Sequence, residues 1–229
     1  FIETLQGPAR RDEPARERFL VIMHDQAERM RRLIDDLLSL SQIEMRAHVR
    51  PKGLVDLVAV ARSAVDSLKP VAADSGMALH FDAAEAPLWV RGEHDELVQV
   101  FDNLIENGIK YGAPGERVSV FAERESRAGG DLAVVSVRDW GPGIPPEHLP
   151  RLTERFYRVD VATSRANKGT GLGLAIVKHI LTRHRGRLSI HSQPDNGATF
   201  TIRLELQPAP EAISEPAVEV KQNQQVKLS

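Results

Sequence analysis

The chain has 229 residues, and its 30 Lys and Arg against 32 Asp and Glu give a formal net charge of −2. This balance argues against a strongly basic nucleic-acid-binding protein, and the absence of cysteine excludes a disulfide framework and thiolate metal sites. With 41% hydrophobic residues and no apolar run near the roughly 20 residues of a membrane span, we expect a soluble chain without nucleic acid as a partner.

A long amphipathic helix of about 35 residues is predicted from Pro14 onward, because apolar residues from Phe19 to Leu40 recur every three or four positions and no Gly or Pro follows until Pro51. It follows a short helical segment, FIETLQ, which ends at Gly7 and Pro8. One interpretation is a surface helix docked on a globular core. We favour a helical hairpin that dimerises, since the preceding segment turns back and so long a helix needs a partner.

After the hinge-like residues 50–53, the pattern changes to alternating helices and strands. The expected elements are a strand and helix over 54–75, strands over 77–83 and 87–92, a helix over 93–112, strands over 117–124 and 132–139, a helix over 172–184, and a hairpin of 187–192 with 198–206. Antiparallel-looking strands mixed with helix pairs favour an α+β sandwich over a doubly wound parallel sheet. From residue 207 the chain lacks periodicity, and we expect disorder there.

The segment FDNLIENGIKYG places three polar side chains on one face of its helix: Asn103, Asn107 and Lys110. An amide oxygen is a suitable ligand for Mg²⁺, and a lysine offers a point charge for phosphate. A solvated polar face explains the same residues equally well. Gly108, inside the helix, costs roughly 1 kcal/mol against Ala and therefore indicates close packing at that point.

In the segment DWGPGI, Asp139 ends a hydrophobic strand, and Gly141 and Gly143 then allow a tight backbone path. A buried carboxylate in this position can accept a hydrogen bond from an exocyclic amine, as in a protein that reads adenine. The alternative is an ordinary Asp-Gly turn.

A third segment, NKGTGLGLAIVKHI, places Gly169, Thr170, Gly171 and Gly173 just before a predicted helix. Backbone N–H groups at a helix start attract anions. The pattern lacks the Lys-Ser/Thr ending of a phosphate-binding P-loop and the βαβ setting of a dinucleotide site, and it could serve only as a turn. The basic, poorly periodic stretch before Gly169 is typical of a mobile lid.

Taken together, these segments resemble the histidine kinases of bacterial two-component systems, within the ATPase class shared by gyrase, the Hsp90 chaperone and the MutL repair protein. FDNLIENGIKYG looks like the N box, DWGPGI and GTGLGLAIVKHI like two glycine boxes, ERFYRVD like the F box, and NGATFTI like the last glycine turn. The long helix is similar to the second dimerisation helix of the PhoR-like phosphate-regulon sensor kinases. The resemblance implies part of a helical hairpin over 1–50, an ATP-binding α/β sandwich over 51–206 with a mostly antiparallel sheet and helices on one face, and a disordered tail over 207–229.

The resemblance also implies roles for individual residues in binding ATP and Mg²⁺. Asn107, helped by Asn103, would hold Mg²⁺, and Lys110 and Tyr111 would contact the phosphates. Asp139 would accept from the adenine amine. The remaining implied ATP-binding residues are Gly141, Gly143 and Ile144 at the base pocket, Gly169, Thr170, Gly171, Leu172 and Gly173 at the phosphates, and Arg155 and Arg158 in the lid.

In the resembling kinases the phosphate acceptor is a histidine on the first dimerisation helix, which we expect upstream of Phe1. His24 lies on the second helix without the usual acceptor context, so we interpret it as a helix-surface residue and assign no catalytic residue. We therefore expect a fragment that binds Mg-ATP but does not phosphorylate itself.

The resemblance further implies a homodimer, a response-regulator partner, and a cytoplasmic fragment of a parent anchored in the bacterial inner membrane. Two alternatives remain at this point: a non-catalytic interaction module with a vestigial pocket, and a serine-directed anti-sigma kinase of the same ATPase class.

Overall fold

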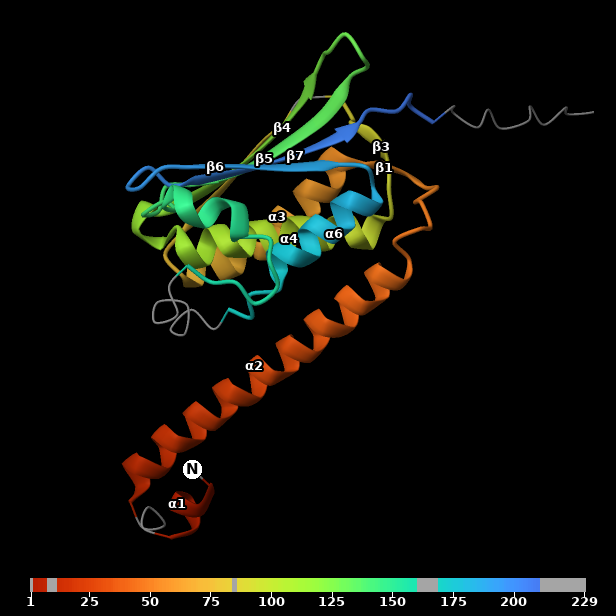
Figure 1. Cartoon of the computed structure of the whole chain (residues 1–229). Helices are drawn as coiled ribbons and strands as arrows, with labels where there is room; N and C mark the ends of the chain where they lie inside the picture. Colours follow the sequence, from red (N-terminus) through yellow and green to blue (C-terminus); the bar gives the residue numbers. More distant parts are fainter. Residues whose placement is uncertain (1, 8–11, 84–85, 160–168, 211–229) are drawn as a thin grey trace, which may run out of the picture.

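The computed structural model describes residues 2–7, 12–83, 86–159 and 169–210 (Figure 1). Its elements in chain order are α1 (Ile2–Gln6), α2 (Glu13–Met45), β1 (Leu54–Asp56), α3 (Leu57–Asp74), β2 (Ala78–Ala83), β3 (Trp89–Arg91), α4 (His94–Tyr111), the 3₁₀ helix η2 (Ala113–Gly115), β4 (Arg117–Glu125), β5 (Leu132–Asp139), the 3₁₀ helix η3 (Pro146–Arg151), α6 (Gly173–Arg183), β6 (Arg187–Ser192) and β7 (Ala198–Glu205). The predicted helices and strands are confirmed, whereas η2 and η3 were not predicted from the sequence.

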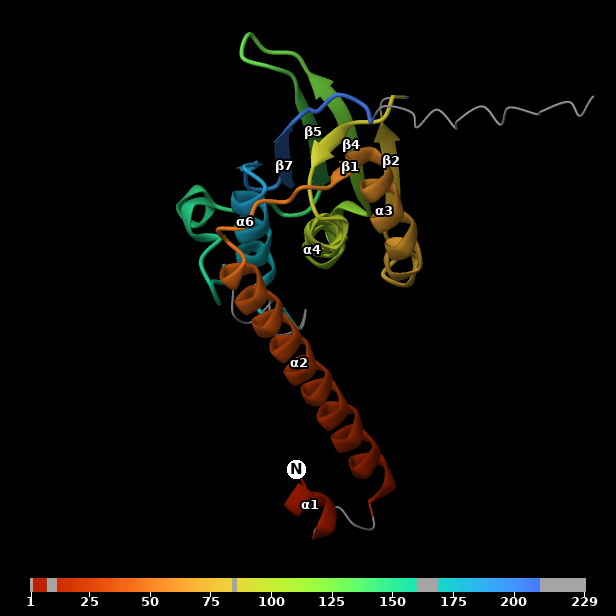
Figure 2. The same ribbon diagram turned by 90° about the vertical axis from the view of Figure 1, so that its right-hand side faces the viewer.

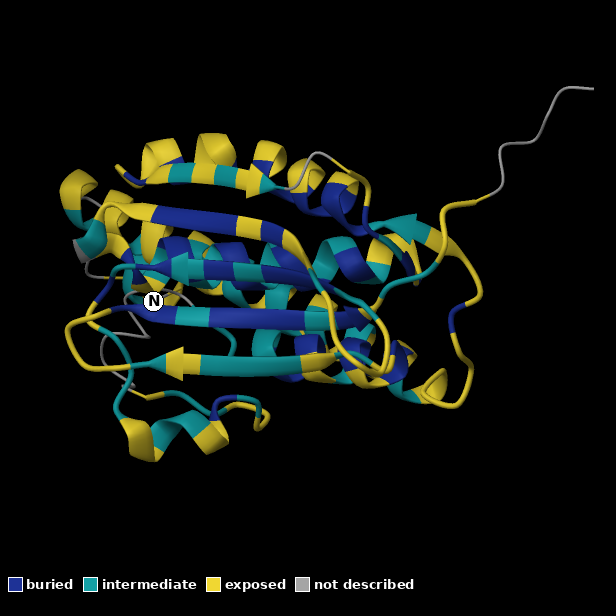
Figure 3. Ribbon diagram, turned by 90° about the horizontal axis from the view of Figure 1, so that it is seen from above, coloured by how far each residue is buried: buried dark blue, intermediate teal, exposed yellow. Residues whose placement is uncertain are grey.

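Five strands form one sheet in the order β2-β4-β5-β7-β6, in which β2 and β4 are parallel and every other neighbouring pair is antiparallel. Helices α3, α4 and α6 cover one face of this sheet (Figure 1). Figure 3 looks onto the opposite face, where the strands lie in front of the helices. The expected α+β sandwich with helices on one face is therefore confirmed.

Alternation along the strands explains why the helices pack on this face. In β4, Val118 and Val120 are fully buried and Ala122 is 3% exposed, while Phe121 between them is 40% exposed. The inward residues meet Leu97, Phe101 and other apolar side chains of α4 in one continuous core. Since successive strand residues point to opposite faces, the sequence pattern alone selects the buried side.

Gly108 of α4 lies close to the sheet. A Cβ atom at this position would be 3.0 Å from a methyl carbon of Val118 on β4. The prediction that this glycine marks close packing is confirmed, and the neighbour is the sheet.

Helix α2 is the 33-residue helix predicted from the long apolar stripe. Its N-cap is Asp12, whose carboxylate accepts a hydrogen bond from the Ala15 N–H at 3.0 Å. Only Leu40 and Ile43 of this helix are buried, at 2% and 4% exposure. Figures 1 and 2 show that its last turns lie beside α6 and that its first turns run away from the sandwich.

A second apolar face of α2 is left exposed. Met30, Ile34 and Leu38 are 63%, 55% and 57% exposed. This face fits the expected dimerisation helix, but dimerisation itself stays a prediction.

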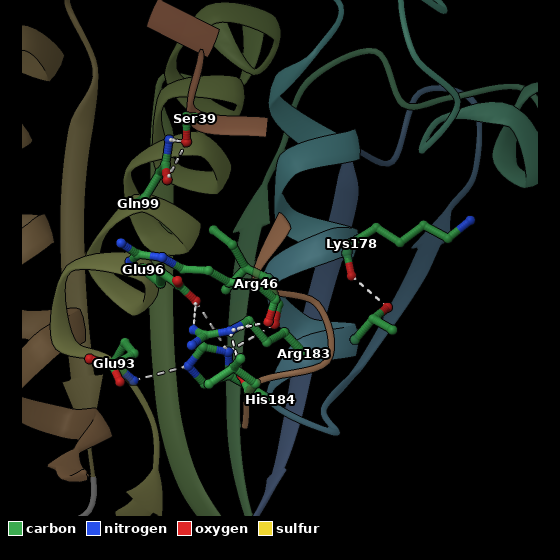
Figure 4. A network of polar contacts seen from close by, with 11 residues as sticks. Ser39, Arg46, Glu93, Glu96, Gln99, Lys178, Arg183 and His184 are labelled. Carbon is green, nitrogen blue, oxygen red and sulfur yellow. Dashed lines mark hydrogen bonds and ion pairs between the residues drawn. The ribbon is translucent and has the colours of Figure 1, made fainter. Parts of the chain in front are cut away.

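A partly buried polar network joins the end of α2 to the sandwich (Figure 4). The Arg183 guanidinium on α6 donates to the Arg46 and Val49 carbonyl oxygens, at 3.2 and 2.9 Å, and pairs with the Glu96 carboxylate on α4 at 2.6 Å. About two helical turns before Arg46, the Ser39 hydroxyl and the Gln99 side chain on α4 exchange hydrogen bonds at 3.0 and 2.9 Å. These contacts hold α2 against the helical face of the sandwich.

Two expectations lie wholly or mostly outside the described residues: the behaviour of 160–168 in the expected lid, and disorder of the tail over 207–229, of which only 207–210 are described. None of the helices in the described part of the chain is long and apolar enough to cross a membrane.

Candidate functional site

A cavity of about 700 Å³ lies between α4, the end of β5, the segment before α6, and α2. It contains most of the residues singled out from the sequence. Those that line it are Asn103, Asn107, Lys110, Tyr111, Asp139, Gly143, Ile144, Arg158, Gly169, Thr170, Gly171 and Gly173. The segments that carry them are distant in sequence, so only the folded chain makes them one site.

The two asparagines of α4 differ in their surroundings. The Asn103 amide donates to the Gln99 carbonyl at 2.8 Å, and its oxygen lies so close to Gly173 that a Cβ there would be 2.4 Å away. Asn103 therefore packs at the contact between α4 and the start of α6. Asn107 lines the cavity, and no such contact holds its side chain within the described part of the chain, which makes its amide oxygen the better candidate ligand for a cation.

Lys110 and Tyr111 occupy the C-terminal turn of α4. The Lys110 ammonium pairs with the Glu106 carboxylate at 2.5 Å, one helical turn away. The Tyr111 hydroxyl approaches the backbone at Gly169, where a Cβ would lie 2.9 Å from it. Tyr111 thus links the helix to the glycine-rich segment.

Asp139 is 7% exposed at the end of β5. Its Oδ1 accepts hydrogen bonds from the Gly141 N–H at 2.9 Å and the Ala198 N–H at 3.2 Å. Burial raises the pKa of this carboxyl, and the two backbone N–H groups oppose that rise. Because both backbone bonds go to Oδ1, the second oxygen is available to a ligand that carries an N–H donor.

Apolar side chains line the cavity together with Asp139. They come from the first glycine box, the residue that follows η3, helix α6 and strand β7: Ile144, Leu152, Leu174, Ala198 and Phe200. An apolar wall with one buried acceptor suits a flat heterocycle that has an exocyclic amine. Of these residues only Ile144 was singled out from the sequence, although inward alternation along 198–204 could have indicated Phe200.

Gly143 shows why the first glycine box needs its glycine. Its φ of +71° is in the left-handed region, and a Cβ there would lie 1.9 Å from the Gln193 carbonyl oxygen. The first glycine box therefore packs against the β6–β7 turn. Just after this turn, the Ala198 N–H donates to the Asp139 carboxylate. Gly141 does not line the cavity itself but supplies the N–H that Asp139 accepts.

The second glycine box forms the start of α6. The N-cap residue Leu172 is fully buried and makes no side-chain cap, so the first N–H groups of this 11-residue helix depend on other partners. One of them, the Leu172 N–H, reaches the Thr170 hydroxyl at 3.3 Å. The Phe156 N–H donates to the Gly171 carbonyl at 2.8 Å, which ties the segment before α6 to the F box.

The two arginines of the F box lie in different places. Arg158 lines the cavity, and its Nε and Nη2 atoms are buried without a hydrogen-bond partner among the described residues. Arg155 is not a lining residue and forms an ion pair with Glu44 of α2. Arg158 is therefore the arginine placed to receive an anionic group, and a role of Arg155 at the cavity stays a prediction.

Several carboxylates at the cavity were not anticipated from the sequence. Asp36 reaches it from α2, and Asp102 and Glu106 reach it from α4. Burial raises the pKa of Asp36 and of Asp102, and the Glu106 charge raises both further. Asp102 and Glu106 each precede one of the asparagines, a spacing that could have indicated them; Asp36 depends on the docking of α2.

These groups do not form a metal site by themselves. In the described part of the chain there is no group of three or more His, Cys, Asp or Glu side chains suited to hold a metal ion. A magnesium ion would thus need the Asn107 amide together with oxygens of a bound ligand.

His24, the histidine considered as a phosphate acceptor, is exposed on α2. The first α2 residue that lines the cavity is Arg32. At 1.5 Å per residue, His24 lies about 12 Å from Arg32 along the helix axis.

Residues 92–208 match the family model described as "Histidine kinase-, DNA gyrase B-, and HSP90-like ATPase". This range includes α4, both glycine boxes, the F box and the last hairpin.

Among curated proteins, the chain is 40% identical over 207 residues to the phosphate regulon sensor protein PhoR of Pseudomonas aeruginosa, covering 89% of this chain and 45% of that protein. It is 37% identical over 198 residues to the sensor-like histidine kinase SenX3 of Mycolicibacterium smegmatis, covering 86% of this chain and 50% of that one. The chain spans about half the length of these relatives. Among solved structures, the mycobacterial sensor histidine kinase MprB superposes with a TM-score of 0.56 at 29% identity, covering 68% of this chain and 98% of that chain.

Proposed function

Because the chain belongs to the histidine kinase-, DNA gyrase B- and HSP90-like ATPase family, we propose that it is the nucleotide-binding part of a two-component sensor histidine kinase. It binds Mg-ATP and presents the γ-phosphate to a histidine side chain. The observation that carries this proposal is that the Arg158 guanidinium, whose Nε and Nη2 are buried without a partner among the described residues, lines the same cavity as the buried carboxylate of Asp139.

In this proposal the chain recognises the two ends of ATP by different means. Asp139 accepts from the adenine amine, and Ile144, Leu174 and Phe200 contact the ring. At the other end, the N–H groups before α6 and the Arg158 side chain bind phosphate oxygens.

The Asn107 amide holds Mg²⁺, which neutralises phosphate charge when it is bound. Lys110 leaves its pairing with Glu106 to approach the phosphates. Phosphoryl transfer requires mainly positioning and charge neutralisation, and these residues supply both.

The partners follow from the relatives and remain part of the proposal. The exposed apolar face of α2 pairs with a second copy of the chain, and a response-regulator receiver domain accepts the phosphate. This part of the protein works in the cytoplasm.

Calorimetric titration with AMPPNP and Mg²⁺ tests the proposal. The wild-type chain should bind the analogue. Asn107→Ala should abolish the dependence on Mg²⁺ while the circular dichroism spectrum stays unchanged, and Arg158→Ala should weaken binding by roughly 10- to 100-fold, the value of one charge-assisted contact. Arg187→Ala, which removes an exposed arginine of β6, serves as the control.

Failure of the wild-type chain to bind AMPPNP would favour the alternative of an interaction module with a vestigial pocket. Equal affinities for wild type and Asn107→Ala would refute the magnesium assignment.

A further inference from the structure

We propose that Asp36 of α2 determines how the cavity discriminates between ATP and ADP. When α2 lies against the sandwich, the Asp36 carboxylate contacts Thr170 in the segment that is proposed to bind the phosphates. This inference rests on the proposed function and adds to it a residue outside the ATPase family match, which covers 92–208.

The contact on which it depends joins two segments that lie 134 residues apart. The Thr170 hydroxyl donates to Asp36 Oδ2 at 2.6 Å. The same hydroxyl accepts the Leu172 N–H at the start of α6. A carboxylate of α2 is thus held, through one hydroxyl, at the helix start that is proposed to bind phosphate.

Further contacts show that α2 is held in this position along several turns. Ser39 bonds Gln99 on α4, Glu44 pairs with Arg155 of the F box, and the Arg46 carbonyl accepts from Arg183. Leu40 and Ile43 are buried between these polar contacts. Asp36 therefore faces Thr170 as part of an extended interface.

The two ends of the cavity can be identified from α4. At its C-terminal end Gly112 abuts Asp139, since a Cβ on Gly112 would lie 2.7 Å from the Asp139 Cβ. Near the middle of α4, Asn103 packs against Gly173. The residues from Asn103 to Tyr111 span about 12 Å at 1.5 Å per residue. A nucleotide whose base contacts Asp139 therefore extends its phosphates toward Gly173, Thr170 and Asp36.

The charges near Asp36 make this end unfavourable for an additional phosphate. Asp35, Asp102 and Glu106 also line the cavity, opposed by Arg32, Lys110 and Arg158. The terminal phosphate of ATP adds negative charge where Asp36 already holds the Thr170 hydroxyl, whereas ADP ends one phosphate earlier. ATP binding and docking of α2 thus oppose each other, while ADP and docking are compatible, and linkage requires the effect to be reciprocal.

Matched substitutions at two adjacent aspartates test the inference. Asp36→Asn removes the charge with little change of shape, and Asp36→Ala also removes the Thr170 contact. Asp35→Asn removes the same charge from the neighbouring residue, which pairs with Arg31 at 3.0 Å. The affinities for AMPPNP and for ADP, both with Mg²⁺, are measured by calorimetry for all four proteins.

Both Asp36 variants should bind AMPPNP about tenfold more tightly than wild type, within the usual range of coupling between sites, while ADP changes less than about twofold. Equal gains for AMPPNP and ADP, or equal gains from Asp35→Asn, would overturn the inference and leave the proposed function intact. If wild type binds neither nucleotide, the proposed function fails and the inference with it.

A cross-link provides a second test that leaves Asp36 and Thr170 in place. The chain has no cysteine, so Ser39→Cys with Gln99→Cys creates one unique pair at a contact between α2 and α4. Joining the two thiols with a short cross-linker should preserve ADP binding and weaken AMPPNP binding at least about tenfold. Unchanged AMPPNP affinity in the cross-linked protein would contradict the inference.

Discussion

Arg183 and Glu96 form an ion pair of 2.6 Å whose side chains are only 4% and 15% exposed. Arg183 also donates to the backbone carbonyls of Arg46 and Val49, just after α2. One guanidinium therefore joins α6, α4 and the segment that follows α2 (Figure 4).

Arg183→Met should lower the free energy of unfolding by about 3–5 kcal/mol, because it leaves the Glu96 carboxylate buried without its partner. Urea unfolding measures this loss. Lys69→Met, which breaks the exposed pair with Asp66, provides the control and should cost at most about 1 kcal/mol. A loss from Arg183→Met as small as that of the control would show that the buried pair does not stabilise the fold.

His184 predicts a pH dependence of stability. Its Nδ1 lies 2.8 Å from the Ile180 carbonyl oxygen, and its Nε2 accepts the Glu93 N–H at 3.1 Å, which assigns a neutral ring. Burial lowers its pKa below the ordinary value of 6.5. The unfolded chain therefore binds more protons between the two pKa values, so stability is full above about pH 6.5 and falls as the pH drops through the folded pKa.

Urea unfolding at several pH values checks this prediction. His184→Gln should flatten the part of the pH profile just below 6.5, whereas His191→Gln, at an exposed position of β6, should leave it unchanged. Identical profiles for wild type and His184→Gln would contradict the assignment of a neutral ring.

Asp139→Asn should weaken binding of AMPPNP by roughly 10- to 100-fold, because a hydrogen bond to a charged acceptor contributes about 1.5–3 kcal/mol. The fold should persist, since an amide oxygen still accepts from the Gly141 and Ala198 N–H groups. Calorimetry measures the affinity, and Asp195→Asn in the exposed β6–β7 turn is the control. An unaltered affinity of Asp139→Asn for AMPPNP would show that the adenine base does not bind at Asp139.

Gly143→Ala should destabilise the protein by about 1–3 kcal/mol or more, because an L residue is strained at a φ of +71° and its Cβ would collide with the Gln193 carbonyl. Gly129→Ala is the matched control, since a Cβ there meets no atom within 4 Å. Thermal unfolding should separate the two variants clearly. Equal melting temperatures would mean that the glycine box adapts without strain.

Local patterns in the sequence determined most of the secondary structure and the identity of the site segments. Helix periodicity identified α2, α4 and α6, and strand alternation identified β4 and β5, because buried and exposed positions repeat along each element. The polar face of α4 and the glycines around Asp139 and Gly173 could be read directly, because helix spacing and backbone freedom are local properties of the chain.

Only the tertiary structure decided how those residues are used. Asn103 and Asn107 look equivalent on the helix, yet only Asn103 packs against Gly173, and of two similar arginines only Arg158 lines the cavity. Asp36 looks like any solvated aspartate of a long helix until Thr170, 134 residues later, donates to it. Such contacts depend on how α2 packs against the sandwich, and the spacing of residues along the chain carries no information about that packing.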